Sequence, residues 1–175
     1  MRPHGYNEVA SISKNAVCIE SKYMPEAPID STPQSDTPCL VPAEQLNRSR
    51  TMALAAVKAA AENRGQDIVV LDLTHQTSLF DFFVIVTGSS RRQLHAIAAE
   101  IDRALRKDLG EQRFSASGYE DSRWIVLDYG SIVIHLFDEE TRGFYDLESL
   151  WGDGQPVEIS DIVGAASAQM ARISE

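Results

Sequence analysis

One stretch whose residue types could do chemistry is Gly88-Ser89-Ser90, which follows an apolar run and opens a helical pattern. Backbone N–H groups at such a strand-to-helix turn can hold a phosphate. The turn lacks the lysine of a P-loop and the spaced glycines of a dinucleotide-binding loop. Glycine for the turn and serine for the helix cap explain the same residues without a ligand, and we favour that interpretation.

A Gly-Ser pair at this position also begins the nucleotidyltransferase signature. That signature needs two carboxylates alternating on a following strand, where they bind the divalent ions of a triphosphate. The strands after the helix offer Asp128 alone, since Asp72 and Asp81 precede the Gly-Ser pair. A nucleotidyltransferase-like fold can be shared while the catalytic metal pair is missing, and we expect no such pair here. A metal-dependent nucleotidyltransferase-like enzyme remains the alternative function.

The second stretch with chemical potential is 123–137, which reads R-W-I-V-L-D-Y-G-S-I-V-I-H-L-F. Its two apolar runs flank a short polar, glycine-bearing break, which predicts a β-hairpin. With Tyr129-Gly130 as a two-residue loop, Trp124 would lie opposite His135. One face of the hairpin is then wholly aliphatic, whereas the other mixes Trp124 with Asp128 and His135. Because tryptophan is over-represented at binding hot spots, the mixed face is a candidate contact surface. The alternative is that a helix covers Trp124 as core and that His135 is a satisfied, half-buried histidine.

The register of this hairpin has alternatives. A two-residue loop of the mirror-image type needs positive φ at both positions, which Gly130 accepts easily and Tyr129 does not. A longer loop with Gly130 in the left-handed region satisfies the same sequence. A slip of one residue would exchange the two faces, but the contrast between the aliphatic and mixed sets favours the pairing given above.

The remaining chemically versatile residues do not form a recognisable site in the sequence. No two of the four histidines stand at metal-ligand spacing. Both cysteines, Cys18 and Cys39, lie in the N-terminal part, so neither a disulfide framework nor a cysteine-based metal site is implied. We expect no metal and no cofactor.

Composition narrows the class of protein. The chain has 175 residues with 43% hydrophobic content, which suits one modest domain with tails. Its formal net charge of −10 disfavours a protein that grips nucleic acid, so we expect no sequence-specific nucleic-acid partner. No run has membrane-spanning length and no secretory signal is visible, so we expect a cytoplasmic protein with no membrane partner.

Periodicity divides the chain into three parts. Residues 1–47 are rich in proline and polar residues and predict a disordered tail, 48–156 an α/β domain, and 157–175 a C-terminal tail with a loose helix. Within the domain we expect a mixed β-sheet flanked by helices. The expected helices are 48–64, 91–109 and 138–150, with strands at 67–74, 82–87 and 114–117 besides the hairpin. One run of residues is interpreted as a solvated helix flank in preference to a second contact surface: Arg142, Tyr145, Asp146, Glu148 and Trp151.

Four segments of the chain resemble one known family. L-D-L-T (71–74), D-F-F-V-I-V-T-G-S-S-R-R-Q (81–93), the hairpin (123–137) and R-G-F-Y-D-L-E-S-L-W-G-D (142–153) resemble the Iojap family, whose bacterial members are ribosomal silencing factors. The match covers roughly 53–153 in the family's order. It implies a nucleotidyltransferase-like fold with no established catalysis, hence a protein that is not an enzyme.

The resemblance also implies a function and a site. Members of the family are expected to bind protein fourteen of the large ribosomal subunit, a basic β-barrel protein, and so to block joining of the small subunit. Translation on a bacterial or organellar ribosome would then be repressed when nutrients are scarce. The carried-over partner-binding residues are Trp124 as the apolar anchor, with Asp128, Tyr129 and His135 beside it. The same apolar surface could pair two free copies as a homodimer.

Overall fold

The structure of the protein is a computed structural model that describes residues 43–173. Of the expected tail 1–47, only the last five positions are therefore described, and they are helical. In chain order the elements are α1 (Ala43–Glu62), β1 (Gln66–Asp72), β2 (Phe82–Thr87), α2 (Arg91–Leu109), β3 (Ser115–Ser117), β4 (Trp124–Asp128), β5 (Ile132–Phe137), α3 (Glu139–Tyr145), α4 (Leu147–Leu150), β6 (Gln155–Pro156) and α5 (Ser160–Ile173).

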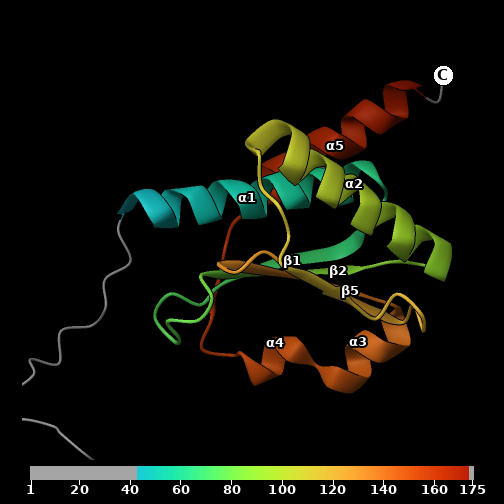
Figure 1. The fold of residues 1–175 in the computed structure, drawn as a ribbon. Helices are drawn as coiled ribbons and strands as arrows, with labels where there is room; N and C mark the ends of the chain where they lie inside the picture. Colours follow the sequence, from blue (N-terminus) through green and yellow to red (C-terminus); the bar gives the residue numbers. More distant parts are fainter. Residues whose placement is uncertain (1–42, 174–175) are drawn as a thin grey trace, which may run out of the picture. The chain divides into compact units, whose positions relative to one another are not determined.

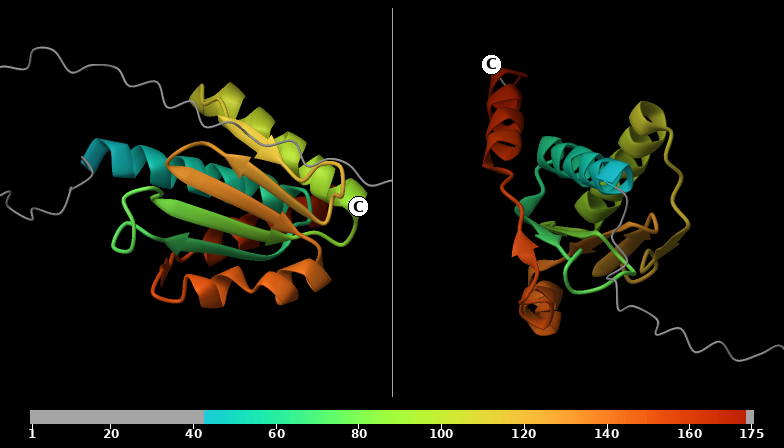
Figure 2. Two further views of the ribbon diagram at one scale, coloured as in Figure 1. Left: turned by 60° about the horizontal axis from the view of Figure 1, so that its bottom comes forward. Right: turned by 90° about the vertical axis from the view of Figure 1, so that its left-hand side faces the viewer.

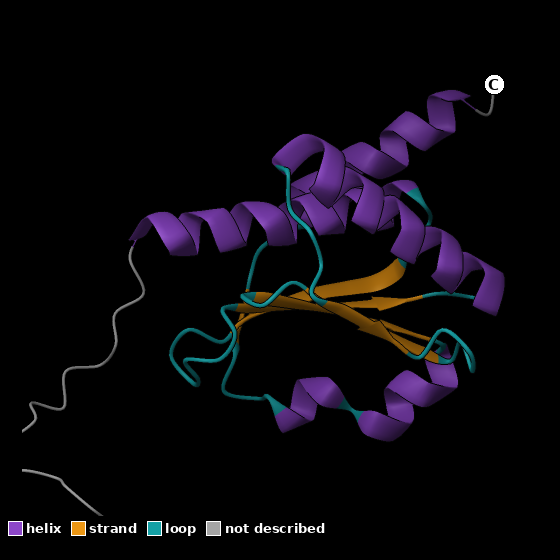
Figure 3. Cartoon of the chain, in the orientation of Figure 1, coloured by secondary structure: helices purple, strands orange, loops and turns teal. Residues whose placement is uncertain are grey.

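A six-stranded sheet with the order β3-β4-β5-β2-β1-β6 organises this part of the chain. The central pair β2 and β5 runs parallel, and every other neighbouring pair is antiparallel. Helices α1, α2 and α5 lie on one face of the sheet, and the short helices α3 and α4 lie on the other (Figure 1, Figure 3). The expected mixed sheet flanked by helices is confirmed, while the nucleotidyltransferase likeness stays a prediction.

The two faces of the sheet are covered to different depths. On the first face, α2 buries the stripe Leu94, Ile97, Ile101 and Leu105, whose spacing of three and four residues places them on one side of a helix. The alanine-rich α1 packs beside it with Ala53, Ala56 and Ala60 buried among the members of the same core. On the second face, the part of the chain that the structure describes places only two short helices over β2 and β5, and both strands are buried along their whole length (Figure 2).

The hairpin of β4 and β5 has the expected faces but not the expected register. Trp124 pairs with Phe137 rather than with His135, and Val126 pairs with His135. The N–H of Tyr129 donates to the carbonyl oxygen of Ile132 at 3.0 Å, so the loop is Gly130-Ser131. The reason is that Gly130 takes the positive φ, 83°, at the first loop position, which spares Tyr129 a conformation it disfavours. Because the slip is two residues, each side chain keeps its face.

Several boundaries differ from those expected. Helix α1 begins at Ala43 instead of residue 48. The single helix expected over 138–150 is two helices, because Asp146 adopts a left-handed conformation with φ 42° between them. The short strand β6 was not expected, and it pairs with β1 at the edge of the sheet.

The C-terminal helix is also part of the packed unit. Ile162 and Val163 of α5 pack against the first core, and Ala166 is buried. None of the helices within 43–173 is long and apolar enough to cross a membrane.

Replacing glycine by alanine should have opposite effects on the free energy of unfolding at two positions of this fold. A Cβ at Gly118, where φ is 81°, would lie 1.8 Å from the carbonyl oxygen of Trp124. In helix α3 a Cβ at Gly143 would meet nothing within 4 Å. We expect Gly118→Ala to lower the free energy of unfolding by about 2 kcal/mol or more. Gly143→Ala should raise it by about 0.5–1 kcal/mol, because alanine favours the helix.

Urea unfolding of both variants beside the unsubstituted chain checks this pair. A Gly118→Ala variant as stable as the unsubstituted chain would show that the 118–124 turn is not held as described.

Candidate protein-docking site

The candidate site centres on Trp124, at the start of β4 on the face that carries α3 and α4. The indole stacks on Phe137 of the neighbouring strand, with ring centroids 4.9 Å apart. Tyr145 of α3 also contacts the indole, with its ring centroid 4.6 Å from that of Trp124. Trp124 is half-buried, so it packs on the sheet and still presents part of its surface to solvent. An aromatic held in this way is rigid before any partner arrives.

His135 fixes the orientation of this indole. Trp124 Nε1–H donates to His135 Nδ1 at 3.3 Å, a diagonal contact that the shifted register permits. Since an indole N–H only donates, Nδ1 must accept, and the imidazole proton sits on Nε2. Within the described part of the chain, that Nε2 is a buried polar atom without a hydrogen-bond partner. His135 is 7% exposed, and burial lowers its pKa from 6.5 to about 4.

Helix α3 is fixed over this face by its first residues. Asp138 caps the helix and accepts from the N–H of Thr141 at 2.7 Å. Arg123, the residue before Trp124, pairs with Asp138 at 2.9 Å and also with Glu140. Partial burial raises the pKa of Asp138, but the hydrogen bonds from Thr141 and Arg123 outweigh it and leave that pKa below its usual value. The pairings join the start of β4 to the start of α3.

Arg142 anchors the middle of α3. Its anchoring role was not predicted from the sequence, which indicated a solvated helix flank. Its Nη1 donates to Thr87 Oγ1 at 2.7 Å and to the carbonyl oxygen of Asp67 at 2.5 Å. Its Nε donates to Glu148 of α4 at 2.8 Å. One guanidinium thus ties both short helices to the ends of β1 and β2. No local signal in the sequence identifies contacts of this range.

Beside Trp124 lies an open pocket of about 530 Å³. Aromatic side chains and charged groups line it together: Arg91, Asp121, Arg123, Trp124, Glu140, Thr141, Phe144 and Tyr145, with Gly118 at one edge. Phe144 is 81% exposed although it sits on an ordered helix, and its ring contacts Tyr145 edge-on. Adjacent helical residues point about 100° apart, so Phe144 and Tyr145 cannot both face the sheet. Two adjacent aromatic residues in a predicted helix were therefore the sequence signal that one of them, Phe144, would be exposed.

The other two residues named for partner binding lie apart from Trp124. Asp128 shares its face of the sheet at the far end of β4, half-buried, and its carboxylate accepts from the N–H of Gly130 at 2.7 Å. Tyr129 is on the opposite face, 5% exposed in the first core, and its hydroxyl donates to Asp102 of α2 at 3.1 Å. Burial and the Asp102 carboxylate raise the pKa of Tyr129. The structure therefore groups Trp124 with His135, and places Tyr129 elsewhere.

The Gly88-Ser89-Ser90 turn is occupied by the chain itself. Ser90 caps α2 by accepting from the N–H of Gln93 at 3.3 Å. The Gln93 side-chain oxygen accepts in turn from the N–H of Ser89, the residue before the cap, at 2.7 Å. Asp138, Glu139 and Glu140 line the adjoining pocket, and their negative charge would repel a phosphate. The turn serves the helix rather than a ligand.

The carboxylates considered for metal binding are likewise engaged separately. Asp72 accepts from the N–H of Thr74 at 3.0 Å, and Asp81 accepts from the hydroxyl of Ser49 at 2.6 Å. Within residues 43–173 no group of three metal-ligating side chains comes together.

Burial of His135 predicts a pH dependence of stability. The unfolded chain takes up this proton near pH 6.5 and the folded chain only near pH 4. The stabilisation is therefore complete above pH 6.5 and is lost as the pH falls towards 4, by about 3 kcal/mol in all. His135→Phe should remove that part of the decline in the free energy of unfolding between pH 7 and pH 4. The exposed His75 supplies the control, because His75→Phe should keep the full decline; equal pH profiles for both variants would contradict the assignment.

Comparison with known proteins gives one consistent result. The family model described as "Ribosomal silencing factor during starvation" matches residues 46–175. The chain is 37% identical to the ribosomal silencing factor RsfS of Bacillus subtilis, over 62% of this chain and 90% of that protein. It is 34% identical to the chloroplastic protein Iojap of Zea mays, over 62% of this chain and 47% of that protein.

The solved structures agree with the sequence relatives. A crystal structure of a protein from Chromobacterium violaceum superposes with a TM-score of 0.57 at 34% identity, covering 62% of this chain and 89% of that one. A structure from Bacillus halodurans gives a TM-score of 0.55 at 32% identity and covers 98% of that chain. The family model includes α5, in keeping with the packing of that helix on the first core. This chain belongs to the RsfS/Iojap family of ribosomal silencing factors.

Proposed function

We propose that this chain binds the large ribosomal subunit through its protein fourteen and sterically blocks joining of the small subunit, which represses translation when nutrients are limiting. The family membership supports the ribosome as target. The contact surface that we assign is the aromatic face made by Trp124, Phe144 and Tyr145 around the pocket beside Trp124. It acts by occupancy alone, and no bond is made or broken.

The observation that carries this proposal is the exposure of aromatic side chains on a rigid support. Phe144 is 81% and Tyr145 48% exposed; the Tyr145 ring contacts the half-buried Trp124, and the Phe144 ring contacts Tyr145. Exposed apolar clusters rimmed by charged groups are typical of protein-docking surfaces. Aromatic residues at the centre of such surfaces contribute most of the binding free energy. Because α3 is anchored by Arg123 and Arg142, little ordering is needed on binding.

The negative charge of this chain supports a basic protein as its binding partner. The chain carries a formal net charge of −10, and Asp128 lies on the same face of the sheet as Trp124. A negative surface steers a basic protein towards it and raises the association rate at low salt. His135 supports Trp124 from beneath instead of touching the partner, since it is buried. Tyr129 stabilises the hairpin from the opposite face through its bond to Asp102.

Phe144→Ala tests the aromatic face with little risk to the fold, because the side chain is almost fully exposed. We expect it to weaken binding to isolated large subunits by about 2 kcal/mol, or about 30-fold, as for a central aromatic contact. Phe114→Ala is the matched control: Phe114 is 79% exposed but packs over Gly130 at the other end of the hairpin.

Binding is measured by co-sedimentation, and subunit joining by sucrose-gradient profiles. Should both variants bind and block equally, the aromatic face is not the docking site. Loss of blocking by the Phe144 variant with retained binding would instead contradict occlusion by simple occupancy. Sedimentation of the free chain at several concentrations reports whether the same face pairs two copies as a homodimer.

Asp128→Asn tests the electrostatic part of the proposal. The amide oxygen of asparagine can still accept from the N–H of Gly130, so the loop persists while one negative charge is removed. We expect slower association with the large subunit at low salt and a smaller effect at high salt, where charges are screened. An association rate identical to that of the unsubstituted chain at low salt would exclude a steering role for Asp128.

A further inference from the structure

A second groove lies at the far end of the hairpin, on the side of α1, and the proposed function does not use it. It has a volume of about 610 Å³ and is open to solvent. One wall is the first three turns of α1, and the other is the segment between α2 and β3 together with the hairpin loop. Its lining residues are Glu44, Gln45, Arg48, Ser49, Met52, Glu111, Phe114, Tyr129 and Ser131.

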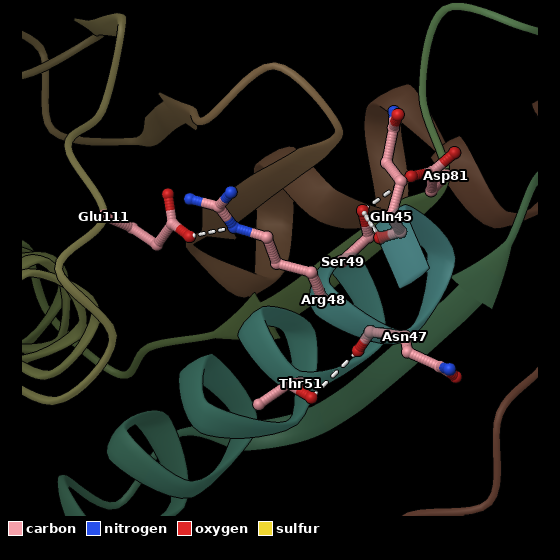
Figure 4. Close-up of polar contacts among 7 residues, drawn as sticks. All are labelled: Gln45, Asn47, Arg48, Ser49, Thr51, Asp81 and Glu111. Carbon is pink, nitrogen blue, oxygen red and sulfur yellow. Dashed lines mark hydrogen bonds and ion pairs between the residues drawn. The ribbon is translucent and has the colours of Figure 1, made fainter. Parts of the chain in front are cut away.

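The walls of this groove are fixed by polar contacts. Arg48 of α1 donates to Glu111 across the groove, with Nε and Oε1 2.5 Å apart. Ser49, buried in α1, donates to the carboxylate of Asp81 at 2.6 Å and so joins the helix to the start of β2 (Figure 4). The groove is therefore preformed, and a segment entering it would not have to open it.

Phe114 forms an apolar edge of the groove, and its ring is exposed to solvent. Its backbone N–H donates to the carbonyl oxygen of Asp128 at 2.8 Å, which fixes the residue beside the hairpin. Its ring lies against Gly130, where an added Cβ would come within 2.5 Å of a ring carbon. The side chain is nevertheless 79% exposed. A large aromatic ring held in one place with its outer surface open is favourable to cover, in proportion to the apolar area removed from water.

The chain supplies a segment of matching chemistry at the right place. Forty-two residues precede α1, and the last five of them read Pro38-Cys39-Leu40-Val41-Pro42. Helix α1 begins at Ala43, and the groove begins with the next residue, Glu44. Five residues can extend about 16 Å. The segment therefore joins the groove directly at its α1 wall.

We propose that residues 38–42 dock in the groove between α1 and the hairpin loop, where Leu40 or Val41 covers Phe114. A docked segment would clamp the hairpin loop from the face opposite Trp124 and Asp128. The part of the chain before α1 would then act on the hairpin without entering the aromatic face. The proposal does not depend on the ribosome and is tested on the free, full-length chain.

The two native cysteines provide the probe. Cys39 lies inside the proposed docking segment and Cys18 lies outside it, so alkylation by iodoacetamide can be followed at both sites of one chain by mass spectrometry. A docked thiol reacts only from the opened population. We expect Phe114→Ser to raise the alkylation rate of Cys39 about tenfold, which corresponds to about 1.4 kcal/mol of docking, and to leave Cys18 unchanged.

Phe144→Ser is the matched control, since it makes the same change at an equally exposed phenylalanine on α3. It should leave the rates of both cysteines unchanged. Leu40→Ser with Val41→Ser should accelerate Cys39 as Phe114→Ser does, and combining all three substitutions should add little further.

Three results would overturn the proposal. Equal effects of Phe114→Ser and Phe144→Ser on Cys39, or no effect of either, would show that the groove does not hold the segment. Fully multiplicative effects of the tail and groove substitutions would show that the two do not touch. Protection of Cys39 that rises with protein concentration would assign the groove to a second copy of the chain.

Discussion

The structure depends on one constraint: the central strands β2 and β5 are buried on both faces, so both faces of the sheet must be covered. The in-register parallel pairing from Phe82 with Ile132 to Thr87 with Phe137 aligns these strands over their whole length. Long helices meet the requirement on one face, where α1 and α2 bury a continuous aliphatic core. On the other face, residues 43–173 provide only α3 and α4, which together are eleven residues long. Aromatic side chains complete that cover, and part of their surface stays exposed to solvent.

Alternating apolar and polar positions made much of this predictable from the sequence. The aliphatic set of Ile125, Leu127 and Ile134 identified the core face of the hairpin, and the mixed set around Trp124 identified the other. That assignment survived an incorrect register because the slip was two residues, and side chains return to the same face with that period. The register itself was decided by Gly130, whose positive φ belongs at the first loop position instead of the second. Tyr129 was consequently assigned to the loop, whereas its side chain enters the core.

Other features follow from contacts that no local pattern encodes. Arg142 bonds to Thr87 and to the backbone of Asp67, each more than fifty positions away along the chain. The break between α3 and α4 depends on a non-glycine residue, Asp146, in the left-handed region, where sequence patterns rarely place one. Strand β6 is two residues long and includes a proline, so it carries no strand signal of its own. Arg142 and β6 depend on partners from distant parts of the chain, which lie beside them only in the folded sheet.

The paired roles of Trp124 and His135 show how one residue can belong both to the core and to a surface. If the indole N–H were free, an apolar partner would have to leave it unsatisfied, at a free-energy cost comparable to a lost hydrogen bond. His135 removes that cost by accepting the N–H from inside the sheet. The polar group left without a hydrogen bond is then Nε2 of His135, which lies buried without a partner in the described part of the chain. Trp124 is therefore left with an apolar outer surface beside Tyr145. The free energy that such a face can contribute to docking comes from desolvating rings, and the charged groups around it serve orientation and rate.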